Sequence, residues 1–253
     1  MDMIRRLALA AGSIGVAAIL ALPTPAFGQS EGDGFLFRRP QGTFTVRMGL
    51  AMPNASGDPF SFFSNELTLT KSNYFAFSVA GDLAFAVAPR LDVVVSGGWA
   101  GSQSPSEMRS WLDANDQPIR QMTTFQRLPL TVSLKYYLRT PGRSVGRFAW
   151  VPEGIAPYLG AGGGLMYSKI HQWGDFVDYR DSTIFSDTYA SESWTGTAHA
   201  FAGVDVPLGP RFVMSGEVRY AYARTPLGPD FKSFGNTMNL SGFSVTVGMG
   251  VRF

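Results

Sequence analysis

Residues 243–253 read Phe-Ser-Val-Thr-Val-Gly-Met-Gly-Val-Arg-Phe, so a large apolar side chain occupies every second position. Successive side chains of a β-strand face opposite sides of the sheet, which makes one face apolar and the other small or polar. A soluble sheet would need a second layer to cover the apolar face, whereas lipid covers it in a membrane barrel. This stretch therefore predicts a strand of a transmembrane β-barrel.

The same alternation recurs along the chain. The eight predicted strands are Thr43–Met52, Tyr74–Val87, Leu91–Ala100, Phe125–Leu138, Ile155–Ile170, Thr197–Leu208, Phe212–Ala223 and Leu240–Phe253. Eight is the smallest usual number of strands in an outer-membrane barrel. We therefore expect an all-β fold, an antiparallel up-and-down transmembrane β-barrel over residues 42–253, preceded by a short periplasmic segment over residues 29–41.

Short connections between the strands alternate with long ones. Ala88–Arg90 and Gly209–Arg211 act as three-residue turns that bring outward-facing residues opposite one another, Val87 to Leu91 and Leu208 to Phe212. The other connections are long, polar loops: Pro53–Asn73, Gly101–Thr123, His171–Trp194 and Arg224–Asn239. The short side is expected in the periplasm. The third link on that side, Arg139–Gly154, is longer than this scheme requires.

The first 28 residues have the features of a secretory signal peptide. Arg5 and Arg6 precede an apolar run over residues 7–22, and Ala26-Phe27-Gly28 places small residues at the two positions that signal peptidase reads. The apolar run is shorter than the roughly 20 residues of a spanning helix. We expect signal peptidase to cleave between Gly28 and Gln29, which removes residues 1–28. The protein is then expected in the outer membrane of a Gram-negative cell.

Composition excludes several classes of function. The chain has no Cys, which rules out disulfides, thiolate metal sites and a lipid anchor on an N-terminal Cys. Charged residues make up 16% and the formal net charge is +2, and this balance argues against a nucleic-acid partner, which requires a basic patch or stripe. We expect no cofactor, no metal and no nucleic-acid partner.

Two motifs carry a resemblance to a known family. Residues 157–164 read Pro-Tyr-Leu-Gly-Ala-Gly-Gly-Gly, a Pro-Tyr-small-Gly strand common in small barrels, and the last predicted strand ends on Phe253. Over about residues 42–253 the chain resembles the OmpA/OmpX-like outer-membrane β-barrel family. The resemblance implies a monomer surrounded by outer-membrane lipid and lipopolysaccharide, with an unknown extracellular ligand for the loops. It also implies that Phe253 is the signal read by the barrel-assembly machinery. No peptidoglycan-binding domain is expected.

Charged residues on the polar face of the strands are the candidate site. They are predicted to form a lumen charge network: Arg47, Asp82, Asp92, Lys135, Asp205, Glu217 and Arg219, with Arg127 and Arg252 on the same face. Arg47, Asp82 and Glu217 stand at similar depth, and because Arg47 and Asp82 lie on neighbouring strands, an ion pair is predicted between these two. An eight-stranded interior has room for little beyond side chains, so the network would fill it. The alternative is a gate in a narrow pore or passage for small solutes, as in OmpW-like barrels.

A barrel enzyme that modifies lipid is the least favoured alternative. A hydroxyl nucleophile needs a base within hydrogen-bond reach, and His171 and His199 are the only histidines. Neither has the His-x-Ser spacing of barrel deacylases, and the Asp residues that follow His171 resemble a solvated loop. We therefore expect a non-catalytic protein with a structural or surface-interaction role.

Aromatic residues outside the strands suggest one further feature. Phe60, Phe62 and Phe63 lie in the first long loop, where they would form either a lid over the barrel mouth or an exposed binding patch. We favour the lid. Twelve other aromatic residues are expected in two interfacial belts: Tyr74, Phe75, Trp99, Phe125, Tyr167, Trp173 and Trp194 on the outer side, and Tyr136, Tyr137, Phe148, Trp150 and Phe212 on the inner side.

Overall fold

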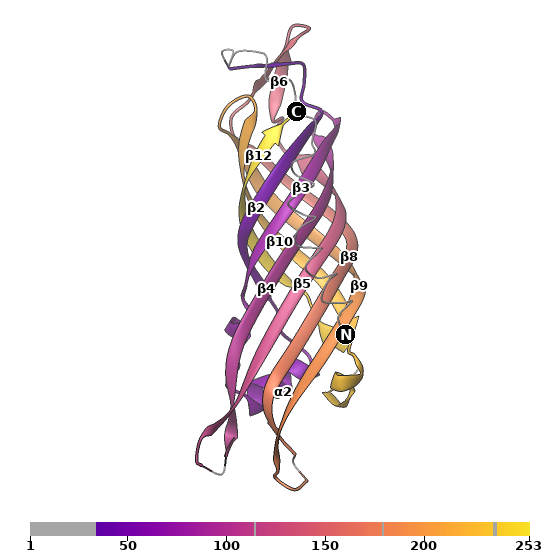
Figure 1. Ribbon diagram of the computed structural model, residues 1–253. Coiled ribbons are helices and arrows are strands. Elements are labelled where there is room, and N and C mark those ends of the chain that lie inside the picture. Colours follow the sequence, from indigo (N-terminus) through magenta and orange to yellow (C-terminus); the bar gives the residue numbers. More distant parts are fainter. Residues whose placement is uncertain (1–33, 114, 179, 235–236) are drawn as a thin grey trace, which may run out of the picture. The chain divides into compact units, whose positions relative to one another are not determined.

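A computed structural model describes residues 34–253 except 114, 179 and 235–236. The predicted signal peptide, residues 1–28, lies outside the described residues, as do residues 29–33 of the segment expected to follow it. The described chain forms one antiparallel barrel (Figure 1). None of its helices combines the length and apolar character needed to cross a membrane.

Eight strands close the ring. In order around the barrel they are β2 (Gly42–Pro53), β3 (Ala76–Ala88), β4 (Leu91–Leu112), β5 (Pro118–Tyr137), β8 (Ala156–Val177), β9 (Ile184–Pro207), β10 (Phe212–Pro226) and β12 (Gly242–Arg252). Each strand pairs antiparallel with the next, and β12 returns to β2. The prediction of an eight-stranded antiparallel barrel is therefore confirmed.

The last residue of the chain contributes to the closure of the ring. Phe253 N–H donates to the Gly42 carbonyl, and the Phe253 carbonyl accepts from the N–H groups of Gln41 and Gly42. A Cβ placed on Gly42 would lie 2.6 Å from the Phe253 ring, so only glycine leaves room for that ring. These contacts extend the β2–β12 ladder to the end of the chain.

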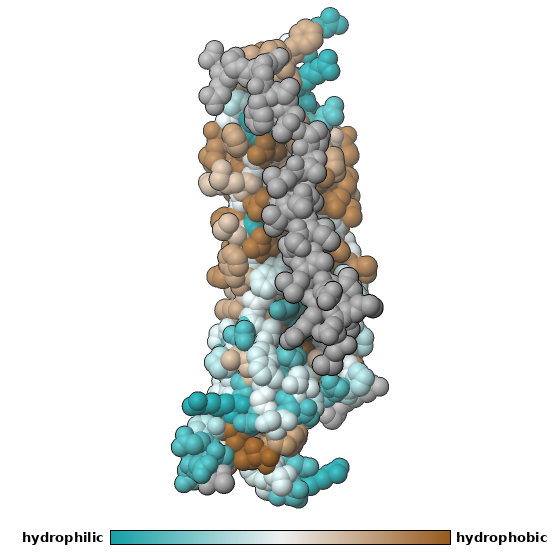
Figure 2. Space-filling model, viewed as in Figure 1, coloured by the Kyte–Doolittle hydropathy of each residue, from teal (hydrophilic) through white to brown (hydrophobic). Residues whose placement is uncertain are grey.

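The outer wall of the barrel carries an apolar belt (Figure 2). Large apolar side chains exposed there include Met48, Leu50, Val95, Leu134, Val247 and Met249, all on the predicted outward face. Lipid covers such a belt in a membrane barrel. The end that holds β6 and the short turns is called the turn end below, and the opposite end, which holds α2, the hairpin end.

Two of the predicted loops are strands. Residues 101–123 and 171–194 were expected to be long loops, but β4, β5, β8 and β9 run through most of both stretches. The described residues left between these strands are 113, 115–117, 178 and 180–183. These four strands are neighbours in the ring, so one side of the barrel rises as a tall wall at the hairpin end (Figure 1).

A reversal of the alternation explains this error. Within the belt, apolar residues face outward toward lipid. Beyond it, Met108, Ile119 and Ile170 face inward, while Arg109 and Arg120 face outward. Water replaces lipid outside the wall there, so the outward face becomes polar and no longer shows the membrane pattern.

The inward apolar face of the tall wall packs against a lid. The lid consists of α2 (Asp58–Glu66), η1 (Lys71–Tyr74), η2 (Pro229–Phe234) and β11 (Thr237–Asn239). Phe60 and Phe63 are 2% and 1% exposed and belong to one apolar cluster with Phe125, Ile170 and Phe231. The lid predicted for these phenylalanines is therefore present.

The long link at the turn end forms a small sheet. β6 (Gly142–Val145) and β7 (Ala149–Pro152) make a hairpin, and β7 also pairs with β1 (Leu36–Phe37) from the segment before the barrel. Pairing with β1 gives the unexplained link Arg139–Gly154 a structural role. We call this three-stranded unit the mouth sheet.

Some local expectations need correction. At the first short turn, Leu91 pairs with Ala88 across an irregularity at Val87, so the simple Val87–Leu91 register was wrong. At the other turn, Leu208 N–H donates to the Phe212 carbonyl, as the predicted register requires. The aromatic belts were partly wrong. Tyr74, Phe125, Tyr137 and Trp150 are buried inside the fold, because their positions in the strands or in the mouth sheet turn them away from lipid.

Candidate functional site

The lumen gathers every charged residue that the alternation placed there. Arg47, Asp82, Asp92, Arg127, Asp205, Glu217 and Arg252 are buried, and Lys135 and Arg219 are nearly so. Instead of one continuous network they form two clusters, with Asp92 beside Lys135 and Tyr137 of the second, and two arginines outside both clusters. Burial of so many charges is tolerated only where each has partners.

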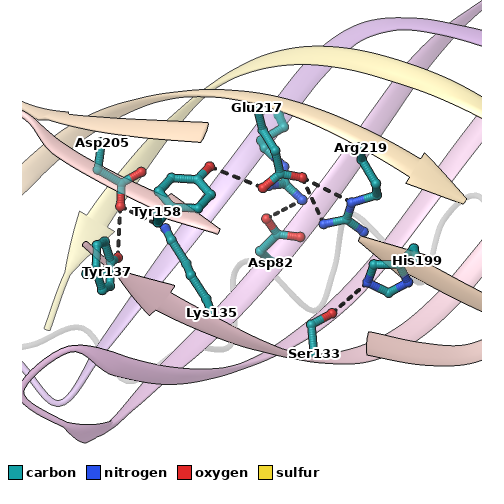
Figure 3. A network of polar contacts seen from close by, with 10 residues as sticks. Asp82, Ser133, Lys135, Tyr137, Tyr158, His199, Asp205, Glu217 and Arg219 are labelled. Carbon is teal, nitrogen blue, oxygen red and sulfur yellow. Dashed lines mark hydrogen bonds and ion pairs between the residues drawn. The ribbon is translucent and has the colours of Figure 1, made fainter. Parts of the chain in front are cut away.

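The larger cluster centres on Arg47 and includes Asp82, Glu217 and Arg219, which are labelled in Figure 3. Its guanidinium binds Asp82 Oδ2 through Nη2 at 2.6 Å and Glu217 Oε2 through Nη1 at 2.5 Å. Arg219 Nη2 reaches the other oxygen of Glu217 at 3.0 Å. Two cations and two carboxylates thus neutralise one another. The expected Arg47–Asp82 pair is present, and Glu217 joins the two arginines.

The second cluster lies nearer the turn end. Lys135 Nζ binds Asp205 Oδ2 at 2.8 Å, and Tyr137 OH donates to the same oxygen at 2.8 Å. Lys135 Nζ also lies 3.7 Å from the centroid of the Tyr158 ring. Tyr158 OH donates to Glu217 Oε2 at 3.1 Å, so its ring stands between the two clusters and its hydroxyl joins the larger one.

Glycines on β8 and β9 make space for the lumen rings. A Cβ on Gly203 would lie 2.5 Å from the Tyr158 ring, and one on Gly160 would lie 2.3 Å from the Phe201 ring. Each ring therefore lies flat over a glycine of the neighbouring strand. The glycine-rich stretch 160–164 serves packing, as its place within a strand indicates.

The isolated arginines lie toward the two ends of the lumen. Arg127 Nη1 donates to the Leu240 carbonyl at 3.0 Å beneath the lid. The Arg252 guanidinium lies 5.3 Å from the centroid of the buried Trp150 ring of the mouth sheet. A cavity of about 110 Å³ separates the Arg47 cluster from Arg127. The lid, the two clusters and Trp150 thus stand at successive depths of the lumen, and a second cavity of about 220 Å³ lies beside Trp150 and Arg252.

Sequence reasoning missed a buried Ser–His contact. Ser133 Oγ and His199 Nε2 lie 2.7 Å apart in the lumen, and the His199 ring stacks on Phe201. The two residues are 66 positions apart, so no local motif could reveal them. A nucleophile of this kind also needs access to its substrate and a group that orients the base. Both side chains face the barrel interior and not the lipid.

Acidic residues at the hairpin tips organise turns. Asp113 Oδ1 accepts the N–H groups of Asn115 and Gln117, and these two contacts, Gln117 first, lower the pKa of Asp113. Asp181 accepts the hydroxyl and N–H of Thr183, which lower its pKa in that order. His171 lies in β8 beside Trp173, not in a loop as expected. Among the described residues no group of three His, Asp or Glu side chains is arranged to hold a metal.

Comparisons with known proteins find likeness in structure only. No protein-family model and no curated protein matches the chain. Among solved structures it is similar to the outer membrane protein OprG from Pseudomonas aeruginosa, at 16% identity and a TM-score of 0.44, covering 86% of this chain and 99% of that one. It is also similar to Neisserial surface protein A (NspA), at 12% identity and a TM-score of 0.43, covering 84% and 97%. A third similar structure is a major outer membrane protein from Thermus thermophilus, at 13% identity and a TM-score of 0.42, covering 84% and 99%.

The Arg47 cluster predicts a large, coupled loss of stability. Arg47→Ala leaves two buried carboxylates facing one arginine, so we expect the free energy of unfolding to fall by about 3–5 kcal/mol. Arg47→Ala with Glu217→Ala leaves Asp82 and Arg219, which are again balanced in charge. The double variant should therefore lose clearly less than the sum of the single variants. Urea unfolding in lipid vesicles, followed by Trp fluorescence, measures each loss.

Lys169→Ala is the matched control, because it removes a cation from an exposed ion pair with Glu192 on the tall wall. Such pairs contribute about 0–1 kcal/mol. Equal losses for Lys169→Ala and Arg47→Ala, or strictly additive losses in the double variant, would contradict this account of the cluster.

Proposed function

We propose that this protein is a non-catalytic integral barrel of the outer membrane whose lumen is closed and whose tall wall is an interaction surface outside the cell. The observation that carries the proposal is the pairing of a blocked lumen with strands that continue past the apolar belt. The lid, the two charge clusters and Trp150 stand one after another along the described lumen, which supports a closed barrel. Meanwhile, β4, β5, β8 and β9 hold two ordered hairpins beyond the lipid.

The location and orientation belong to the same proposal. Residues 1–28 would act as a cleaved signal peptide, and the turn end would lie in the periplasm. The protein would be a monomer surrounded by outer-membrane lipid and lipopolysaccharide. It would be a member of the OmpA/OmpX-like family. The features that support this are the apolar belt, the eight-stranded ring and the contrast between short turns and tall hairpins.

Orientation can be tested by cysteine labelling, because the chain has no native Cys. Asn115→Cys places a thiol at a hairpin tip, and Ser144→Cys places one in the mouth sheet. We expect a membrane-impermeant maleimide to label Asn115→Cys on intact cells and Ser144→Cys only after the outer membrane is permeabilised. The reverse pattern would contradict the orientation, and labelling of neither variant in lysed cells would indicate that the sites are buried.

A narrow gated pore is the second candidate. The cavity of about 110 Å³ between the Arg47 cluster and Arg127 favours it, since the lumen is not filled throughout. A pore would open where the Arg47 cluster breaks. The lid, however, closes the hairpin end through a separate set of contacts, including Phe60 against Tyr74 and Phe125.

Single-channel recordings in a planar bilayer distinguish the two candidates. A closed scaffold predicts no conductance from the wild type, and none from Arg47→Ala, because the lid stays in place. Discrete open steps in the wild type that change in Arg47→Ala would establish the pore instead. Lys169→Ala is the control variant, and a heat-dependent gel shift shows that each sample is folded.

Catalysis on lipid is the third candidate and the least supported. Of the two histidines, His199 faces the lumen and contacts Ser133, on the opposite side of the wall from lipid. His171 lies on the tall wall, where Lys169 binds Glu192. Neither residue has the neighbours that a hydrolase acting on membrane lipid requires.

We also propose that Phe253 is the signal read by the barrel-assembly machinery. Its backbone completes the β2–β12 ladder, while its side chain is exposed on the outer wall, where an assembly partner could read it. We expect Phe253→Ser to lower the amount of protein in outer-membrane fractions and Phe253→Tyr to restore it. Phe212→Ser removes another exposed phenylalanine from the same end and should have the smaller effect. Equal losses for both serine variants would reduce Phe253 to an ordinary lipid contact.

A further inference from the structure

Basic residues gather at the turn end of the barrel. Arg39, Arg90, Arg139 and Arg211 stand where the strands end, and Arg38, Arg143 and Arg147 belong to the mouth sheet or adjoin it. All seven are exposed. The described part of this end offers Glu153 as a partly exposed carboxylate, and Arg143 pairs with it at 3.4 Å. The surface therefore has a strong positive excess.

The hairpin end has a different charge pattern. Its two tips carry Asp113, Asp116, Asp178 and Asp181, and arginines and lysines there are mixed with acids. Lys169 pairs with Glu192, and Arg120 pairs with Glu107. A general need for solubility would place charge of both signs at both ends. The arginine excess is thus particular to the turn end.

The arginines stand next to side chains that reach toward lipid. Arg139 follows Leu138 and Arg211 precedes Phe212, and both apolar side chains are about half exposed at the edge of the belt. A long side chain one residue beyond the belt carries its guanidinium to the depth of lipid headgroups. Guanidinium groups bind phosphate oxygens in paired hydrogen bonds, which suits that depth.

The mouth sheet shows the same pairing of aromatic and basic side chains. Phe37 is 66% exposed beside Arg38, and Phe148 is 63% exposed beside Arg147. Exposed phenylalanine next to arginine is typical of segments that lie in a membrane interface. A purely soluble anionic partner would explain the arginines but not these phenylalanines.

The seven exposed arginines at the turn end are called the arginine rim. We propose that the arginine rim binds the phosphate headgroups of anionic phospholipid in the leaflet that this end contacts. The proposal rests on the membrane location proposed above and adds a lipid preference to it. Surface arginines each contribute about 1 kcal/mol toward an anionic leaflet, which is roughly a fivefold change in affinity.

The test compares lipid binding by two variants of equal net charge. The rim variant is Arg90→Gln with Arg139→Gln and Arg211→Gln, and the control variant is Lys71→Gln with Arg180→Gln and Arg224→Gln at the hairpin end. Each folded protein in neutral detergent is titrated with phosphatidylglycerol or phosphatidylethanolamine, and bound lipid is counted by native mass spectrometry. We expect the wild type and the control to prefer phosphatidylglycerol and the rim variant to bind it about 100-fold more weakly.

Three outcomes would overturn the proposal. The rim variant could keep the wild-type affinity for phosphatidylglycerol, or inorganic phosphate could displace the lipid at equal concentration, which would indicate a general anion site. Purified cell-wall sacculi could instead bind the wild type but not the rim variant, without any lipid preference, which would make the anionic cell-wall polymer the partner. A heat-dependent gel shift on each sample separates these outcomes from a failure of the barrel to fold as a membrane protein.

Discussion

The hydrogen bonds between β2 and β12 are the contacts on which the rest of this structure depends. In hydrocarbon no water is available to satisfy a backbone N–H or C=O, so an open sheet edge costs several kcal/mol for each unpaired group. The ladder runs from Thr43 opposite Arg252 to Pro53 opposite Gly242 and leaves no edge in the ring. Once the ring is closed, alternate residues must face either lipid or a narrow interior. Those two environments decide the chemistry of every position in the belt.

The division of positions between lipid and the interior also determines how much of the fold can be predicted from the sequence. Inside the belt, lipid imposes an apolar residue at every second position, and the strands there could be placed from the sequence. Outside the belt this requirement ends, and the tall wall was mistaken for loops because its outward residues are polar. Its inward residues, such as Ile119 and Ile170, make sense only once the lid opposite them is known. The mouth sheet was missed because β1 and β7 are short and pair across more than 100 residues.

The candidate site was predictable to a similar degree. Inward position and equal depth were enough to expect Arg47 beside Asp82, since β2 and β3 are sequential neighbours. Glu217 and Arg219 lie two residues apart on β10, and β12 separates that strand from β2, so the contact of Glu217 with Arg47 depends on how the side chains of β2 and β10 meet inside the ring. The contact of Ser133 with His199 depends on side-chain packing next to Phe201. Alternation gives the face on which a residue lies but not its partners across the lumen.

The mouth sheet also has a mechanical consequence. In the ring, β8 stands four strands from β2 in either direction, so the link that precedes β8 begins its course on the far side from β2. The pairing of β1 with β7 therefore connects two opposite sides of the barrel opening at the turn end. A thin cylinder yields to sideways pressure by flattening into an oval. Because this pairing spans the opening, we expect it to oppose flattening of the turn end under lateral pressure from the bilayer.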